Sequence, residues 1–142
     1  MTLNLYMNKI GKNAKDAFKN LSGSNIKNRN AVLIQFCAYL KSNKNLLLKA
    51  NKKDLLKLKE NKSNMRERLI LDNHKINQII SSVKKIIKFK NPVDKELASW
   101  KRPNGLVIKR VSIPIGIIGV IYESRPNVTS DVSALAFKSG NV

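Results

Sequence analysis

The sequence has 142 residues, the size of one ordinary domain or of a piece of something larger. Its 28 Lys and Arg against 9 Asp and Glu give a formal net charge of +19 at pH 7. With 42% hydrophobic residues the chain has enough apolar material for a core, which excludes disorder throughout. A single cysteine excludes an internal disulfide and fits a reducing compartment. A single histidine argues against a histidine-rich centre, so we expect no metal.

The sequence shows neither a secretory signal nor a membrane span. Residues 1–20 mix Lys, Asn and Asp with scattered apolar residues and lack the cleavage site of a signal peptide. The longest apolar run, residues 111–122, is shorter than the roughly 20 residues that cross a bilayer. It also contains Pro114, Gly116 and Gly119. We therefore predict a soluble, cytoplasmic chain with no membrane partner.

The positive charge is concentrated in the first part of the chain. Residues 1–90 hold 21 basic and 5 acidic side chains, whereas residues 111–142 hold 2 of each, which places a composition boundary near residues 90–100. Such charge permits nucleic-acid binding, because lysines facing phosphates release counterions. Aromatics are only 6%, and the lysines are spread along helical polar faces, so we interpret them as solvated surface. A small basic helical nucleic-acid-binding module remains the alternative.

Apolar residues at three- and four-residue spacing predict helices through most of residues 1–90. The predicted helices cover residues 10–21, a segment starting at Ser24 or Asn25, residues 43–60, residues 65–71 after a polar break at 61–64, and residues 73–90. The last of these has the clearest apolar stripe. Its members are Ile76, Ile79, Ile80, Val83 and Ile87.

Two chemically reactive residue types fall inside these helices. Cys37 lies in an apolar stripe with Leu33 and Leu40, which favours core packing over a nucleophilic thiol. His74 opens the helix at residues 73–90 in a polar first turn, which is typical of a solvated surface histidine rather than of a ligand.

The pattern changes at Asn91-Pro92, because proline ends a helix at the residue before it. Residues 98–113 predict two short strands around a turn that contains Asn104-Gly105, a strong hairpin signal. The sequence thus predicts a β-hairpin between the helical region and the last part of the chain.

The last part of the chain predicts a strand, a turn and a helix. Residues 115–122 form a continuous apolar, β-branched run, which is typical of a strand buried on both faces of a parallel sheet. A polar turn at residues 123–127 follows, then a helix over residues 128–138 and a stop at residues 139–141. The predicted fold class is α/β, in which ligands bind beyond the carboxyl ends of strands and therefore at this turn. The chain ends at Val142, where the helix should lead to a next strand, so the sequence looks cut off inside a domain.

Three segments of the last third are specific enough to suggest a family. They are Arg102-Pro103-Asn104-Gly105-Leu106, the run from Val111 to Thr129 with the turn Tyr122-Glu123-Ser124-Arg125-Pro126-Asn127, and Ala136-Phe137-Lys138-Ser139-Gly140-Asn141-Val142. Together with Ala50-Asn51-Lys52-Lys53-Asp54-Leu55 and Arg66-Glu67-Arg68-Leu69 upstream, they resemble the gamma-glutamyl phosphate reductase family, also called glutamate-5-semialdehyde dehydrogenases, of the aldehyde dehydrogenase superfamily. The resemblance covers nearly the whole chain and is strongest from Trp100 onward.

The resemblance implies an oxidoreductase of proline biosynthesis that reduces L-glutamyl 5-phosphate with NADPH to L-glutamate 5-semialdehyde and phosphate. In this family a cysteine thiolate displaces phosphate to give a thioester, which then receives a hydride. No residue of this sequence matches that cysteine. The resemblance therefore implies an N-terminal fragment, and we expect the fragment alone to be inactive.

The resemblance also assigns roles to residues of the turn. Asn127 matches the asparagine that helps to form the family's oxyanion hole. Ser124, Arg125 and Pro126 are candidate cofactor contacts, with an anionic group of the substrate as the alternative ligand of Ser124 and Arg125. Structural alternatives remain open for two of them. Asn127 is also a candidate helix cap, and Arg125 a candidate ion-pair partner of Glu123 or Asp131.

By the same resemblance, the chain divides into three parts. Residues 1–96 are the basic helical region, residues 97–113 are a β-hairpin of the kind that pairs subunits, and residues 114–142 begin a truncated, Rossmann-like, aldehyde dehydrogenase-type dinucleotide-binding domain. We expect a small-molecule substrate and a homo-oligomer when intact. A third possibility is the reductase half of a fused kinase-reductase.

Overall fold

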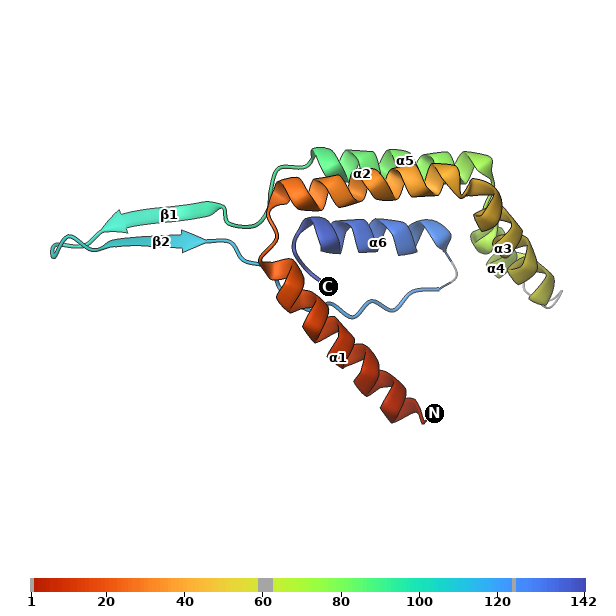
Figure 1. The fold of residues 1–142 in the computed structure, drawn as a ribbon, viewed down its shortest axis with the longest axis horizontal. Coiled ribbons are helices and arrows are strands. Elements are labelled where there is room, and N and C mark those ends of the chain that lie inside the picture. The colour runs from red at the N-terminus through yellow and green to blue at the C-terminus, as the bar shows by residue number, and fades with distance from the viewer. Residues whose placement is uncertain (1, 59–62, 124) are drawn as a thin grey trace.

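The computed structural model describes residues 2–58, 63–123 and 125–142, and is mostly helical (Figure 1). Its elements are α1 (Leu3–Ser22), α2 (Ile26–Ser42), α3 (Lys44–Lys57), α4 (Ser63–Leu69), α5 (Asn73–Lys88), β1 (Glu96–Lys101), β2 (Val107–Val111) and α6 (Pro126–Lys138). Each helix predicted from the sequence is confirmed, with ends that differ by a few residues except for α1, which begins seven residues earlier. Of the predicted break at residues 61–64, residues 61 and 62 lie outside the described residues, and the prediction is wrong for Ser63 and Asn64, which already belong to α4.

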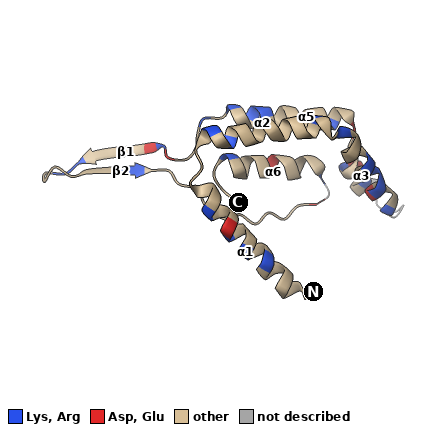
Figure 2. Ribbon diagram, in the orientation of Figure 1, with Lys and Arg blue, Asp and Glu red and all other residues tan. Residues whose placement is uncertain are grey.

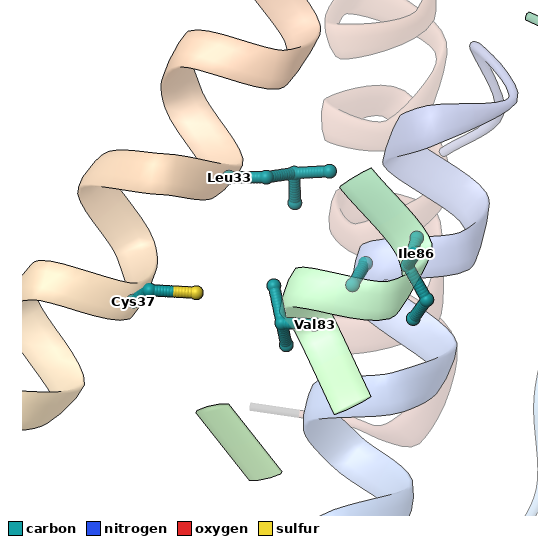
Figure 3. Close-up of a cluster of buried hydrophobic side chains, with 5 residues drawn as sticks. Leu33, Cys37, Val83 and Ile86 are labelled. Atoms are coloured by element: carbon teal, nitrogen blue, oxygen red, sulfur yellow. The ribbon is translucent and has the colours of Figure 1, made fainter. Parts of the chain in front are cut away.

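The core lies where α2, α5 and α6 pack against one another. Leu33 and Cys37 of α2 face Val83 and Ile86 of α5, and Ala134 of α6 completes the cluster (Figure 3). Each fully buried aliphatic side chain contributes about 1.5–3 kcal/mol relative to an exposed one. The apolar stripe of α5 therefore has the buried role that its spacing predicts.

Side-chain caps fix where two of these helices begin. The Oδ1 atom of Asn25 accepts a hydrogen bond from the amide of Asn28 at 2.9 Å, and Asp72 accepts one from the amide of Lys75 at 2.7 Å. Each cap satisfies one of the amides that the first turn of a helix leaves without a partner. Asn25, rather than Ser24, is thus the N-cap of α2.

The first helix packs differently from the others, because it runs away from the three-helix core (Figure 1). Leu21, near its C-terminal end, is buried, whereas Tyr6, Met7 and Ile10 are exposed. The apolar stripe predicted for residues 10–21 is therefore only partly covered, mainly towards the C-terminal end of the helix.

The predicted hairpin is confirmed and projects from the helical body as a two-stranded arm (Figure 1). The strands are antiparallel, with Trp100 opposite Ile108. In the connecting turn, the amide of Gly105 donates to the carbonyl of Arg102 at 2.9 Å. Gly105 has φ of 88°, a conformation that a glycine adopts without strain.

The segment predicted as a strand buried on both faces is different in the structure. No strand is assigned within residues 112–123, and the side chains of Ile115 and Ile121 are 85% and 103% exposed. The segment runs alongside α6 in the opposite direction (Figure 1). A β-strand requires a continuous row of hydrogen bonds to a neighbouring strand, and the described residues contain no strand that pairs with this segment. They also contain no strand that covers its faces.

The segment nevertheless makes the first bonds of a parallel ladder. The amide of Ile118 donates to the carbonyl of Val142 at 2.7 Å, and the amide of Val142 donates to the carbonyl of Gly116 at 3.0 Å. Val142 thus bonds to Gly116 and Ile118, the two neighbours of Ile117, which lies opposite it. Such slanted hydrogen bonds are typical of parallel strands. Asn141 reinforces it, because its Oδ1 atom accepts from the Gly116 amide at 2.8 Å. Residues 116–142 therefore have the backbone pairing of a β-α-β unit, as expected for an α/β fold.

Candidate functional site at the N-terminus of α6

The site predicted from the sequence is the turn that joins residues 115–122 to α6. Two side-chain contacts hold this turn in place. The hydroxyl of Tyr122 bonds to that of Thr129 at 2.7 Å, and the carboxylate of Glu123 pairs with Arg68 of α4 at 3.4 Å. The turn is thus tied both to the helix that follows it and to a helix about 55 residues earlier in the chain.

Asn127 lies inside the first turn of α6 and is not its cap. The helix begins with Pro126 at its first position, because proline needs no amide partner there, and Arg125 occupies the N-cap position. The side chain of Arg125 makes no capping hydrogen bond with a described residue. The capping interpretation of Asn127 is therefore wrong, and its exposed side chain remains available for other contacts.

The first amides of α6 give this end a partial positive charge. Because Arg125 does not cap these amides and Asn127 lies in the same first turn, the helix end can stabilise negative charge on an oxygen atom that is placed there. This geometry is compatible with the oxyanion role that the sequence resemblance assigns to Asn127.

Arg125 is exposed, and the two ion pairs considered for it do not form. Glu123 pairs with Arg68 instead, and the Oδ1 atom of Asp131 has no hydrogen-bond partner among the described residues. Pro126 lies beside Asn127 in the wall of a groove. Ser124, the other predicted cofactor contact, lies outside the described residues.

The groove next to Asn127 has a volume of about 310 Å³. Its wall on one side is the start of α6, with Asn127 and Asp131. Its opposite wall comes from α5 and the residues before it, with Arg68, Lys75 and Gln78. Arg68, Lys75 and Asp131 were not identified as site residues from the sequence. The available signal was the spacing between Asn127 and Asp131, since residues four apart share one face of a helix.

Cys37, the one cysteine of the sequence, is a core residue. Its side chain is 6% exposed and points between α2 and α5 towards Val83 (Figure 3). Burial raises the pKa of the Cys37 thiol, and the nearby charge of Lys84 only partly offsets this. A thiol that stays protonated in an apolar environment is a poor nucleophile, which confirms the core interpretation.

Two buried cations at the other end of α6 have a structural role. Lys138 is 3% exposed, and its ammonium group donates to Asn30 at 2.6 Å and to the carbonyl of Ile87 at 2.9 Å. Arg29 is 2% exposed and donates to Asn91 at 3.2 Å. Burial, and then the charge of Arg29, lower the pKa of Lys138. These bonds join α6 to both α2 and α5, and so help to fix the helix that carries Asn127.

Other kinds of site find little support in the described residues. Within them, no three His, Cys, Asp or Glu side chains come together as metal ligands, and no helix is long and apolar enough to cross a membrane. The Lys and Arg residues are distributed along the helices and the hairpin (Figure 2).

Comparison with known proteins gives a consistent result. No family model matches the chain. A gamma-glutamyl phosphate reductase from Nitratiruptor sp. is 47% identical over 116 residues, which cover 80% of this chain and 28% of the relative. The Clostridium tetani reductase is 39% identical over 141 residues, 98% of this chain and 33% of the relative.

Solved structures agree with the sequence comparison. The crystal structure of gamma-glutamyl phosphate reductase from Thermotoga maritima matches with a TM-score of 0.88 at 37% identity, over 92% of this chain and 32% of that one. The crystal structure of the Saccharomyces cerevisiae reductase matches with a TM-score of 0.87 at 32% identity, over 94% of this chain and 34% of that one. Nearly the whole chain is thus similar, in sequence and in fold, to part of gamma-glutamyl phosphate reductases.

The chain spans about a third of the length of the reductases that it matches. The match is to the N-terminal part of the solved reductases, and it includes the helices, the hairpin and α6. None of these relatives is named for nucleic-acid binding, so the comparisons do not favour the alternative of a basic nucleic-acid-binding module.

Proposed function

We propose that the chain is the N-terminal part of an NADPH-dependent reductase that converts L-glutamyl 5-phosphate into L-glutamate 5-semialdehyde and phosphate in proline biosynthesis. The observation that carries this proposal is the match of nearly the whole chain, in sequence and in fold, to gamma-glutamyl phosphate reductases. An exposed asparagine in the first turn of a helix whose N-cap residue, Arg125, makes no capping bond supports it, because acyl transfer needs donors aimed at a developing oxyanion.

The role of this chain in the reaction is electrostatic. A thiolate from another part of the intact reductase adds to the acyl carbon, the carbonyl oxygen becomes an oxyanion, and phosphate leaves as the thioester forms. Asn127 and the first amides of α6 stabilise that oxyanion. Removal of one such donor typically lowers kcat by about 10²–10³-fold. Cys37 supplies no nucleophile, because it is buried in the core.

The nicotinamide cofactor supplies the hydride that reduces the thioester. The residues present fit part of such a cofactor: Arg125 is an exposed cation at the N-terminus of α6, and a cation beside a helix N-terminus suits phosphate groups. We assign Arg125, Pro126 and Ser124 to contacts with NADPH on this basis and on the family resemblance.

The division of the chain into residues 1–96, 97–113 and 114–142 is part of the same proposal. In it, the hairpin arm pairs subunits of a homo-oligomer, since Leu97, Trp100 and Val107 are exposed on the arm. The reductase works in the cytoplasm, where a catalytic thiol stays reduced.

A chimera tests the proposal directly. The part of the Thermotoga maritima reductase that this chain matches is replaced by residues 1–142, and NADP⁺ reduction is measured with L-glutamate 5-semialdehyde and phosphate. We expect activity in the chimera, none in the 142-residue chain alone, and a kcat about 10²–10³-fold lower in Asn127→Ala.

Asn45→Ala is the matched control, because Asn45 is an exposed asparagine on α3, far from the site in the sequence. It should leave kcat unchanged. A chimera that folds with a cooperative melting transition and yet has no reductase activity would contradict the proposed function.

A further inference from the structure

The groove beside α6 contains a carboxylate oxygen that nothing in the described part of the chain satisfies. The Oδ1 atom of Asp131 is buried and has no hydrogen-bond partner there. Buried polar atoms are nearly always paired, and each exception calls for an explanation such as a missing ligand. A buried carboxylate oxygen is a negatively charged hydrogen-bond acceptor, and it is best satisfied by a positively charged donor.

The position of Asp131 places this oxygen beside the predicted site. Asp131 is four residues after Asn127, about one helical turn, and both residues line the cavity of about 310 Å³. A ligand in this groove can therefore contact Asp131 while another part of it lies at Asn127. The groove is large enough for a small metabolite.

The opposite wall of the groove has the opposite charge. Arg68 and Lys75 line it, and neither neutralises Asp131. Arg68 pairs with Glu123 at 3.4 Å, and the ammonium group of Lys75 donates to the carbonyls of Ile70 at 2.7 Å and Glu67 at 3.4 Å. The groove is thus lined by two cations and by one carboxylate oxygen that has no hydrogen-bond partner among the described residues.

This charge pattern distinguishes among ligands. A bare anion such as phosphate is disfavoured at Asp131, because like charges repel. A metal ion is disfavoured because no cluster of three His, Cys, Asp or Glu residues occurs in the described part of the chain. A zwitterion fits, since its ammonium and carboxylate groups match the two walls.

We propose that Asp131 binds the ammonium group of an α-amino-acid substrate, whose carboxylate faces Arg68 and Lys75. This inference rests on the proposed function, which it extends by naming a specificity-determining residue for the amino-acid end of the substrate. Asp131 selects glutamyl compounds over analogues of the same length that lack the amino group.

The first test uses the 142-residue chain and a pair of probes, L-glutamate and glutarate. Glutarate keeps both carboxylates and lacks the amino group. In amide NMR titrations we expect saturable shifts at residues 127–132 with L-glutamate, and about 10- to 100-fold weaker binding of glutarate. Asp131→Asn should abolish this preference, whereas Asp54→Asn, at an exposed carboxylate of α3, should retain it.

Three results would overturn the inference: equal binding of the two probes, no saturable binding of L-glutamate, or an undiminished preference in Asp131→Asn. The amide spectrum itself shows whether the variant is folded. Asp131→Ser provides a second variant, which removes the charge and shortens the side chain.

The second test uses the chimera with the Thermotoga maritima reductase. Asp131→Asn should raise KM for L-glutamate 5-semialdehyde about 10- to 100-fold and leave KM for NADP⁺ unchanged. An unchanged KM for the semialdehyde would contradict the inference. The NMR titration involves no reduction, so an inactive chimera combined with a retained preference for L-glutamate would refute the proposed function alone. An active chimera without that preference would refute the role of Asp131 alone.

Discussion

Helix α5 and the segment at residues 113–121 are both rich in isoleucine and valine, yet they have opposite environments. Ile76 and Val83 of α5 are 1% and 0% exposed, whereas Ile115 and Ile121 are 85% and 103% exposed. The difference comes from their partners. Helix α5 packs against α2 and α6 within the same chain, whereas among the described residues the segment forms hydrogen bonds only with Asn141 and Val142. Apolar composition shows that a segment requires cover, but the neighbouring elements determine whether it is covered.

The largest expected change in stability comes from substituting a buried isoleucine of α5, which is compared with the same substitution in the exposed segment. Ile76→Ala removes buried methyl and methylene groups and leaves a cavity, so it should lower the free energy of unfolding by about 2–5 kcal/mol. Ile121→Ala removes the same atoms from a side chain that is 103% exposed, and should change the free energy of unfolding by less than about 0.5 kcal/mol. Urea denaturation followed by circular dichroism measures both. Similar losses in the two variants would show that the segment is buried in solution.

The next prediction concerns the contact between the C-terminal end of α6 and the core. Gly140 has φ of 73°, and a Cβ atom there would lie 2.6 Å from Nη1 of the buried Arg29. Gly140→Ala combines backbone strain with this steric conflict and should destabilise the chain by about 1–3 kcal/mol.

Gly119→Ala is the control for this substitution. Gly119 has no positive φ and no atom within 4 Å of its would-be Cβ, so alanine should be neutral or slightly stabilising. If thermal melting gave equal losses for the two variants, the close approach of Gly140 to Arg29 would be disproved.

Local sequence patterns predicted the elements of this fold well, because each pattern depends on neighbouring residues. The stripe of α5, the cap at Asn25 and the turn at Asn104-Gly105 are set by spacing and by local hydrogen bonds. The exposure of α1 and of residues 115–121 was not predictable in this way. Periodicity identifies an apolar face without specifying what packs on it.

The candidate site shows the same limit. The turn was located correctly at the start of α6, and Asn127 was identified there by resemblance. Its capping interpretation failed, because α6 starts at Pro126, two residues before the predicted start at Val128, and Arg125 is therefore the cap. The contributions of Arg68 and Lys75 depend on how α4 and α5 pack beside α6, and no local pattern specifies that arrangement.

A smaller effect is expected at the start of α5, which is the better-covered of the two compared regions. Asp72→Ala removes the 2.7 Å bond to the amide of Lys75 and should cost about 1 kcal/mol of unfolding free energy. Asp54→Ala, at an exposed carboxylate inside α3, has no cap to lose and should have a smaller effect. An equal loss in both variants, measured by urea denaturation, would indicate a general charge effect instead of capping.

The smallest effect is expected in the hairpin arm, which like residues 113–121 has little cover from the helices. Glu96 and Lys109 form a cross-strand ion pair at 2.9 Å, with side chains that are 48% and 58% exposed. Water and salt screen such a pair, so a double-mutant cycle with Glu96→Gln and Lys109→Met should give a coupling of about 0.2–1 kcal/mol at low salt. Raising the salt to 1 M should remove most of it, because the Debye length then falls to about 3 Å. A coupling that persisted at high salt would mean that another surface shields the pair from water, and therefore that the arm is covered in solution.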